Sequence, residues 1–158
     1  MVIIELISTK KGETMSKICT LLGHRELNTD SIRARTEKVL IDLIENHDVS
    51  VFYTANNGDF DYMCNDIITE LKKIYKHIKL CWIAAYSFYN MHAKEKMIYD
   101  EIIIPNFRTI GFKQTMAARN EWMVENSDVL VYYINHGYGV TKDAVEYALN
   151  TEICVVKI

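Results

Sequence analysis

Five short runs of apolar residues divide the chain, and most of the segments between them repeat apolar residues every three or four positions. The runs occupy residues 17–22, 49–54, 78–86, 128–134 and 153–158. Continuous apolar runs of this length are typical of strands that are buried on both faces, as parallel sheets require. The pattern therefore predicts five strands that are separated mainly by helices.

Helical spacing of the apolar residues predicts the helices. They cover residues 32–46, 60–75, 113–126 and 139–150. The polar residues 28–31 offer an N-cap to the first of them. Because strands alternate with helices and no hairpin signal interrupts them, we expect an α/β fold with an open, doubly wound parallel sheet of about five strands, Rossmann-like. Ligands of such sheets bind outside the carboxyl ends of the strands.

Residues 87–112 have only weak periodicity and contain the single proline, Pro105. Connections of this length in a compact domain often cover a functional site. The stretch is either such a lid or a merely irregular connection.

Composition and charge narrow the classes of function. With 158 residues, 49% hydrophobic and 25% charged, the chain suits one soluble globular domain. The net charge of −3 argues against a nucleic-acid-binding face, which needs clustered basic residues. No apolar run approaches the length of a membrane span. We therefore expect neither a nucleic acid nor a membrane as partner.

The four cysteines form no Cys-x-x-Cys pair, and three of them lie within apolar runs. This usage predicts buried, reduced thiols in a cytoplasmic protein. No spacing among the five histidines is that of a metal site. We assign neither a metal nor another cofactor.

Residues 1–14 differ from the rest of the chain. A polar stretch, residues 10–14, ends just before Met15, which resembles a second start ahead of the first apolar run. We expect an N-terminal extension at residues 1–14 and one domain at residues 15–158, with Met15 as an alternative or true start.

Residues 116–148 carry the features that most often hold a phosphate. Gly137 and Gly139 follow the fourth apolar run and open the next helix, where backbone amides lack partners and the helix dipole is positive. Arg119 lies on the preceding helix among Met and Ala residues, so its guanidinium needs an anionic partner. That partner is either a phosphate or ribose hydroxyls of a ligand, or a nearby carboxylate. The nearby carboxylates are those of Glu121, Glu125 and Asp143.

Other candidates follow the first two strands. His24 and Arg25 come after the first strand, and Asn57 and Gly58 come after the second. Each has a structural alternative, because a histidine there often fixes a loop by a hydrogen bond and an Asn-Gly pair often caps a helix. Tyr138 is a candidate for stacking on a base. The expected ligand-binding residues are Gly23, His24, Arg25, Asn57, Gly58, Gly137, Tyr138, Gly139, Val140 and Thr141.

Three segments resemble the small bacterial Rossmann-like proteins of the SLOG superfamily. They are residues 20–25 (Thr-Leu-Leu-Gly-His-Arg), 52–60 with Asn-Gly-Asp-Phe at its end, and 119–128 with Arg-Asn-Glu-Trp-Met and Ser-Asp. The similarity covers residues 17–158 and is closest to a YpsA-type domain of unknown function. The superfamily also includes the Lonely guy phosphoribohydrolases, the DNA-processing protein A family and sensor domains of bacterial conflict systems. The resemblance therefore implies a nucleotide or a nucleotide-derived ligand.

The phosphoribohydrolases carry the motifs Met-x-x-Arg-Lys and Gly-Gly-x-Gly-Thr-x-x-Glu. Residues 116–120 match the first motif except for Asn at its last place, and residues 136–143 keep two glycines of the second. By resemblance, Arg119 and Asp143 take the positions of the catalytic pair. The departures argue against catalysis, since Val140 replaces the threonine and Asp143 is one methylene shorter than the glutamate.

The sequence favours a domain that binds a nucleotide or a nucleotide-derived small molecule, as a sensor or a sequestering protein. One alternative is a nucleoside 5′-monophosphate phosphoribohydrolase, in which Arg119 positions the sugar phosphate and Asp143 stabilises an oxocarbenium-like centre or orients water. Another alternative is an interaction module with a vestigial pocket. The Met and Trp residues of the 113–126 helix indicate either a homo-oligomer contact or a buried core helix.

Overall fold

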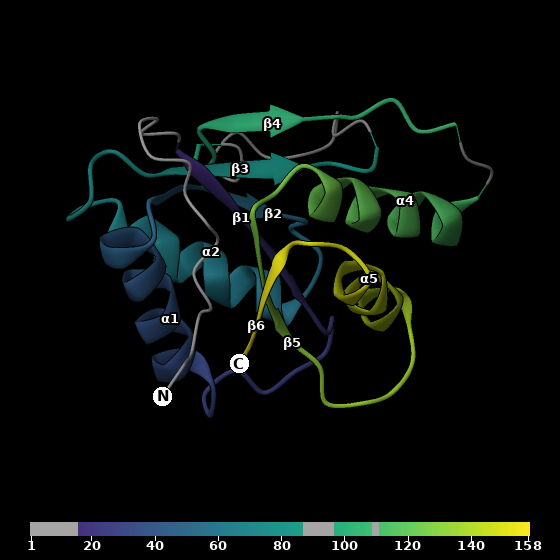
Figure 1. Ribbon diagram of the computed structural model, residues 1–158, viewed down its shortest axis with the longest axis horizontal. Helices are drawn as coiled ribbons and strands as arrows, with labels where there is room; N and C mark the ends of the chain where they lie inside the picture. The colour runs from purple at the N-terminus through teal and green to yellow at the C-terminus, as the bar shows by residue number, and fades with distance from the viewer. Residues whose placement is uncertain (1–15, 87–96, 109–110) are drawn as a thin grey trace.

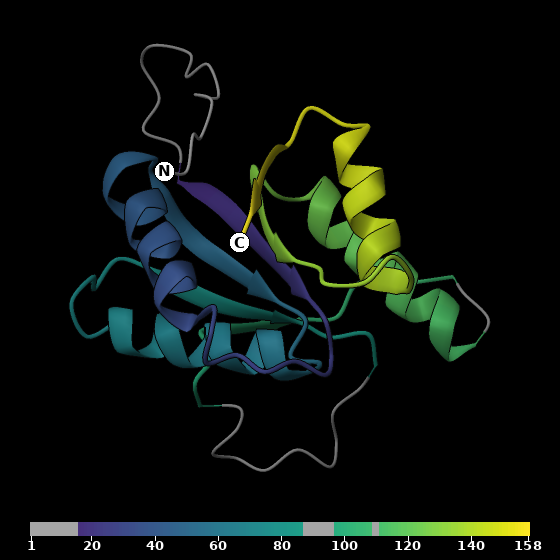
Figure 2. The same ribbon diagram turned by 90° about the horizontal axis from the view of Figure 1, so that it is seen from below.

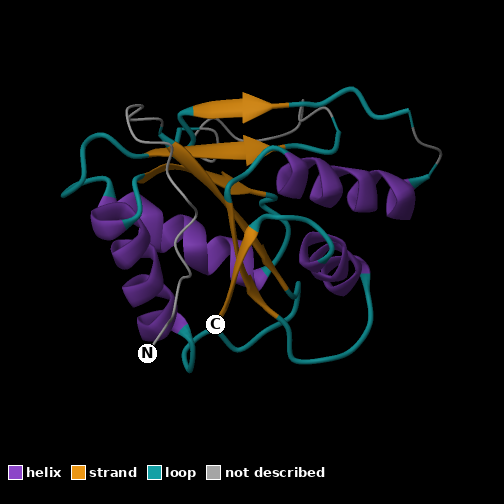
Figure 3. Ribbon diagram, in the orientation of Figure 1, coloured by secondary structure: helices purple, strands orange, loops and turns teal. Residues whose placement is uncertain are grey.

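Six parallel strands form one sheet in the part of the chain that the computed structural model describes, which is residues 16–86, 97–108 and 111–158. The order across the sheet is β4-β3-β2-β1-β5-β6 (Figure 1, Figure 3). The predicted α/β fold with an open, doubly wound parallel sheet is confirmed. The strands are β1 (Lys17–Gly23), β2 (Val49–Thr54), β3 (Lys79–Ile83), β4 (Glu101–Ile103), β5 (Val129–Tyr133) and β6 (Cys154–Lys157).

In the described residues, two helices cover each face of the sheet (Figure 2). One face carries α1 (Arg33–Asn46) and α2 (Asp59–Leu71), and the other carries α4 (Phe112–Glu125) and α5 (Val140–Leu149). Successive side chains along β1 point to opposite faces of the sheet and so pack against both helical layers. Leu21 is buried in the cluster with α1 and α2, whereas Leu22 is buried in the cluster with α4 and α5.

The strand order reverses at β1. From β1 the chain moves outward through β2, β3 and β4, and it then returns to place β5 on the other side of β1. Thr20 pairs with Tyr53 of β2, and Leu22 pairs with Tyr132 of β5. The loops after β1 and β5 lead to helices on opposite faces, and such reversals are where doubly wound sheets bind ligands.

The sheet has one strand more than the sequence pattern predicts, because β4 is absent from the prediction. This strand has only three residues, Glu101–Ile103, and lies at the edge of the sheet beside β3. So short a run falls below the length at which apolar residues identify a strand. Tyr99, just before it, is buried in the core, so this part of the 87–112 stretch belongs to the fold rather than to a lid.

The predicted N-cap of α1 is wrong. The helix begins after Ile32, which provides no side-chain cap. Asn28 instead accepts a hydrogen bond from the backbone N–H of Asp30 at 3.1 Å, which stabilises the turn before the helix.

The Met and Trp residues of α4 face the core of this chain. Met116 and Met123 are buried, and Trp122 stacks on Tyr53 of β2 with ring centroids 5.8 Å apart. Of the two alternatives for this helix, the packing within the chain fits the buried core helix.

The expected extension at residues 1–14 and the start at Met15 lie outside the described residues, as do residues 87–96 and 109–110. None of the helices in the described ranges is long and apolar enough to cross a membrane.

The start of α2 packs directly against the loop that follows β1. Gly58 has φ 128°, and a Cβ atom at this position would lie 2.4 Å from the Cα of Arg25. Asp59 secures the same contact, because its N–H donates to the carbonyl of Arg25 at 2.9 Å and its Oδ2 accepts from the N–H of Leu27 at 2.8 Å. Only glycine fits at position 58, and α2 thereby fixes the backbone at Arg25.

We expect Gly58→Ala to destabilise the protein more than Gly111→Ala. Both glycines precede a helix with positive φ, 128° and 89°, so each alanine adds backbone strain of roughly 1–3 kcal/mol. At Gly111 a Cβ atom meets nothing within 4 Å among the described residues, whereas at Gly58 it meets the backbone of Arg25. We expect a further loss of about 1–3 kcal/mol for Gly58→Ala in urea unfolding. Equal losses of unfolding free energy in the two variants would show that the loop after β1 moves away from the new Cβ atom without a cost in stability.

Candidate functional site

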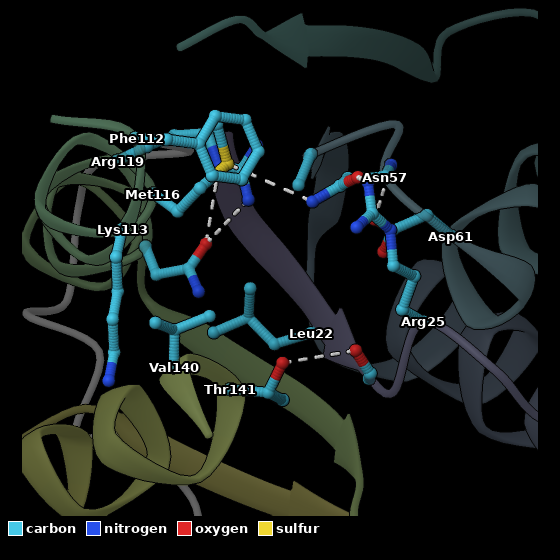
Figure 4. Close-up of a pocket in the computed structure, with 13 residues that line it drawn as sticks. Leu22, Arg25, Asn57, Asp61, Phe112, Lys113, Met116, Arg119, Val140 and Thr141 are labelled. Atoms are coloured by element: carbon cyan, nitrogen blue, oxygen red, sulfur yellow. Dashed lines mark hydrogen bonds between the residues drawn. The ribbon is translucent and has the colours of Figure 1, made fainter.

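A cavity of about 190 Å³ opens at the carboxyl edge of the sheet, beside the reversal of strand order (Figure 4). Its walls come from the ends of β1 and β2 and the residues just after them, from the first turns of α2 and α5, and from α4 between Phe112 and Asn120. The lining residues are Leu22, Gly23, Arg25, Ala55, Asn57, Asp61, Phe112, Lys113, Met116, Arg119, Asn120, Val140 and Thr141.

The helices α2, α4 and α5 all begin at this cavity because each follows a strand that ends at the same edge of the sheet. Their N-caps are Gly58, Gly111 and Gly139, and none provides a side-chain cap. The first N–H groups of a helix lack partners within the helix, and the dipole end there is positive. The convergence of three such ends favours an anion in the cavity.

Arg119 lies on the inner face of α4, and only 4% of its surface is exposed. Its Nε and Nη2 donate to Oδ1 of the neighbouring Asn120 at 3.3 and 3.1 Å. No ion pair within 4.0 Å joins it to a carboxylate of the described residues, so none of the acidic partners considered from the sequence holds it. Burial lowers the pKa of this guanidinium from its ordinary value, Asp61 opposes that shift, and Arg25 adds to it.

Asp61 is a second buried charged residue in the same cavity, with 4% of its surface exposed. It lies in the first turn of α2, and its Oδ2 accepts a hydrogen bond from the N–H of Asn57 at 2.9 Å. Its Oδ1 is buried without a hydrogen-bond partner among the described residues. Burial raises the pKa of this carboxyl to about 6, although the Asn57 hydrogen bond and the charge of Arg119 lower it. A carboxyl that titrates near neutral pH in a cavity is a candidate functional group.

Arg25 and Asn57 complete the wall beside Asp61. Arg25 Nη2 donates to Oδ1 of Asn57 at 3.0 Å, and Nδ2 of Asn57 lies 3.8 Å from the sulfur of Met116. Figure 4 shows Arg25, Asn57 and Asp61 on one side of the cavity, with the α4 residues on the other side. Arg25 and Asn57 thus reach the cavity as expected, whereas Gly58 serves the packing of α2.

Only the end of the glycine-containing turn after β5 reaches the cavity. Val140 and Thr141 line it, and the Thr141 hydroxyl donates to the carbonyl of Gly23 at 3.1 Å, which ties α5 to the end of β1. Gly139 has φ 102° and precedes α5 without lining the cavity. Gly137 lines a separate hollow beside β6. Of the residues predicted in this turn, only those at the start of α5 therefore lie in the cavity with the other candidate residues.

His24 supports this turn and does not line the cavity. Its buried ring stacks on His136 with centroids 3.6 Å apart, and its Nε2 accepts a hydrogen bond from the backbone N–H of His136 at 3.3 Å. Burial and the nearby His136 lower the pKa of His24, which keeps the ring neutral and able to accept. Tyr138 stacks on His136 at 4.1 Å and is 72% exposed, outside the cavity lining. The geometry agrees with the loop-fixing alternative for His24.

The structure separates the two residues assigned to the catalytic pair. Arg119 is buried in the cavity, whereas Asp143 is exposed in the first turn of α5 and does not line it. On α5, Ala144, Val145 and Ala148 face the core, so position 143 falls on the outer side of the helix. The carboxyl in the cavity with Arg119 is that of Asp61.

Besides the apolar lining residues Leu22, Ala55 and Met116, sequence reasoning missed four others, of which Asp61 is the most informative. The spacing of residues in the sequence could have identified it, because Asp61 shares a helix face with Cys64 and Ile68. An acidic residue within an apolar helix face is costly to bury and therefore indicates a specific role. The other three are from α4, where the helix begins only at Phe112 and its spacing alone identifies no cavity. They are Phe112, Lys113 and Asn120.

We expect the Asp61 carboxyl to make the folded protein less stable as pH rises from about 4 to about 6. Its folded-state pKa of about 6 exceeds the ordinary value of 3.8, so the folded state binds this proton more tightly than the unfolded chain. The resulting stabilisation is fully present below the ordinary value and is lost as pH rises through the folded value. The shift corresponds to a loss on the order of 3 kcal/mol.

Urea unfolding from about pH 4 to pH 7 measures this effect. Asp61→Asn carries no charge and should remove that component of the pH dependence. Asp66→Asn, an exposed position on the same helix, should retain it. An unchanged profile in Asp61→Asn would contradict burial of an ionisable carboxyl as the cause.

Comparison with known proteins supports the fold. No family model matches the chain, and no curated protein matches it. The structure of DNA processing protein A (DprA) from Streptococcus pneumoniae is similar with a TM-score of 0.66 and 13% identity, over 90% of this chain and 50% of that one. The chain therefore spans about half the length of that protein.

A second similar structure is the molybdenum cofactor carrier protein from Chlamydomonas reinhardtii. Its TM-score is 0.52 with 13% identity, and the match covers 89% of this chain and 75% of that one. At such identities the likeness concerns the fold alone. Both neighbours agree with the parallel sheet and its helical layers in assigning this chain a Rossmann-like α/β fold.

Proposed function

We propose that the chain is a SLOG-type domain that binds a nucleotide or a nucleotide-derived small molecule, as a sensor or a sequestering protein. The observation that carries this proposal is the buried guanidinium of Arg119. It lines a cavity at the reversal of strand order, and no ion pair within 4.0 Å joins it to a carboxylate in the described part of the chain.

The charge of the cavity favours an anionic ligand. Three cations, Arg25, Lys113 and Arg119, line it, against the single carboxyl of Asp61, although the chain as a whole carries a net charge of −3. The helix starts add positive potential from backbone dipoles. A neutral ligand would leave Arg119 buried with only the more distant charge of Asp61 to balance it, whereas a phosphate would supply a directly hydrogen-bonded anion.

The place of the cavity and the similar structures support a nucleotide-like ligand. Doubly wound sheets bind nucleotides at the reversal of strand order, with the phosphate at a helix start. The sequence resembles the superfamily that contains the DNA-processing protein A family, and a protein of that name is one structural neighbour. The other neighbour is a carrier of a small-molecule cofactor, which suits a role in holding a ligand.

Binding without turnover fits the geometry better than hydrolysis. The phosphoribohydrolase alternative needs the carboxylate of Asp143 beside the ligand, and that residue is exposed outside the cavity. An interaction module with a vestigial pocket would leave the charges of both Arg119 and Asp61 buried for no ligand, at a cost to stability.

Calorimetry with the four nucleoside 5′-monophosphates tests the proposal. We expect binding, and we expect Arg119→Gln to weaken it by about 10- to 100-fold, because a charge-assisted hydrogen bond contributes about 1.5–3 kcal/mol. Arg25→Gln should weaken binding less, since its side chain is exposed at the rim. Arg35→Gln, an exposed position on α1 away from the cavity, is the matched control and should leave affinity unchanged.

The alternatives give different results. Release of free base from a monophosphate would favour the phosphoribohydrolase. Absence of binding by any monophosphate would favour the interaction module. Because Arg119 is buried, thermal unfolding must first show that the Arg119→Gln variant is folded before its affinity is interpreted. If that variant does not fold, the affinity of Arg25→Gln decides the test.

A further inference from the structure

The carboxyl of Asp61 is the one group of the cavity whose hydrogen bonding is left incomplete among the described residues. Its Oδ2 is held by the N–H of Asn57 at 2.9 Å, but its Oδ1 is buried with no partner. Buried carboxylate oxygens without a donor are costly, and native proteins rarely retain them outside functional sites. A donor that is supplied by a ligand would remove this cost.

Asp61 and Arg119 place opposite requirements on one small ligand. Asp61 comes from α2, Arg119 from α4, and the two helices cover opposite faces of the sheet. Figure 4 shows the two residues on different sides of the cavity. A phosphate is attracted to Arg119 and the start of α5. On the other side Arg25 also attracts an anion, but the Asp61 carboxylate itself repels one and accepts a hydrogen bond. The ligand must therefore have an anionic end and a hydroxyl or amine end.

The size of the cavity limits how much of the ligand is enclosed. Its volume of about 190 Å³ is smaller than the roughly 300–1,000 Å³ that encloses a whole drug-sized molecule. The mouth carries Phe112, which is 58% exposed and stacks on Tyr86 with centroids 6.0 Å apart. An exposed aromatic rim accepts the flat face of any base without reading its edge.

We propose that the site recognises the ribose 5-phosphate part of a ribonucleotide, with Asp61 Oδ1 accepting a hydrogen bond from the 2-hydroxyl of the ribose and the base left at the rim. This proposal rests on the proposed function and names its ligand more closely. The enclosed sugar phosphate provides the specificity, and Phe112 provides a stacking surface that tolerates different bases.

Calorimetry on the full chain with five compounds tests the proposal. The compounds are inorganic phosphate, ribose 5-phosphate, 2-deoxyribose 5-phosphate, adenosine 5′-monophosphate and guanosine 5′-monophosphate. We expect ribose 5-phosphate to bind about 10-fold or more tightly than its 2-deoxy analogue, because the latter leaves Asp61 with fewer donors. The two monophosphates should differ by less than about 3-fold, since the rim does not read base edges.

Asp61→Ala should bring the ratio between ribose 5-phosphate and its 2-deoxy analogue close to 1. Inorganic phosphate should bind this variant as well as the wild type or more tightly, because a negative charge has been removed. Asp66→Ala, an exposed acid on the same helix, should preserve the ratio. Asp61→Leu is similar in shape, carries no acceptor, and replaces Asp61→Ala in the comparison if the alanine variant does not fold.

The outcomes separate this inference from the proposed function. If none of the five compounds binds the wild type, the phosphate site itself is absent and both proposals fail. If phosphate compounds bind but the 2-deoxy analogue binds equally well, or the ratio survives in Asp61→Ala, only the role of Asp61 is overturned. A preference for one base larger than that for ribose over deoxyribose would assign Asp61 to the base and likewise overturn it.

Discussion

The central position of β1 is the constraint on which the rest of the structure depends. This strand pairs with β2 on one side and β5 on the other, and helices cover both of its faces. It therefore tolerates polar groups only where they are satisfied, as for Thr20, whose hydroxyl donates to the carbonyl of Met123 at 3.0 Å. Because the chain leaves β1 and β5 toward opposite faces, the edge between them is where the cavity opens.

That cavity combines features that a purely structural edge would avoid. A guanidinium and a carboxyl are buried in one small space. Burial lowers the pKa of Arg119 and raises the pKa of Asp61, so it favours the neutral form of each group. Without a ligand both groups work against stability, because among the described residues Asp61 Oδ1 has no hydrogen-bond partner and Arg119 forms no ion pair within 4.0 Å. Local departures of this kind are typical of functional sites, where other parts of the fold compensate. Here the compensation comes from well-packed clusters on both faces of the sheet.

The secondary structure followed closely from the spacing of apolar residues, with two instructive failures. The edge strand β4 was not predicted, because Glu101–Ile103 is too short to show a periodic pattern of apolar residues. Its pairing with β3 is a tertiary contact that the local sequence does not reveal. The N-cap of α1 failed because Asn28 forms a local turn, which competes with capping for the same side chain. Capping residues therefore indicate that a helix begins nearby, while packing decides where.

The candidate site was predicted only in part, and the reason is geometric. Arg119 was identified because a cation within an apolar helix face stands out in the sequence. Its partner in the motif, Asp143, does not line the cavity, because α5 turns that position toward solvent. Asp61 was missed because its importance depends on α2 meeting α4 at the edge of the sheet, from opposite faces.

The sequence by itself determined the layers of this protein. Burial on two faces requires continuous apolar runs, and burial on one face requires helical spacing, so both are visible without coordinates. Only the tertiary structure decided which polar groups share a cavity. That choice depends on strand order and on the rotation of each helix about its axis, and neither leaves a periodic mark along the chain.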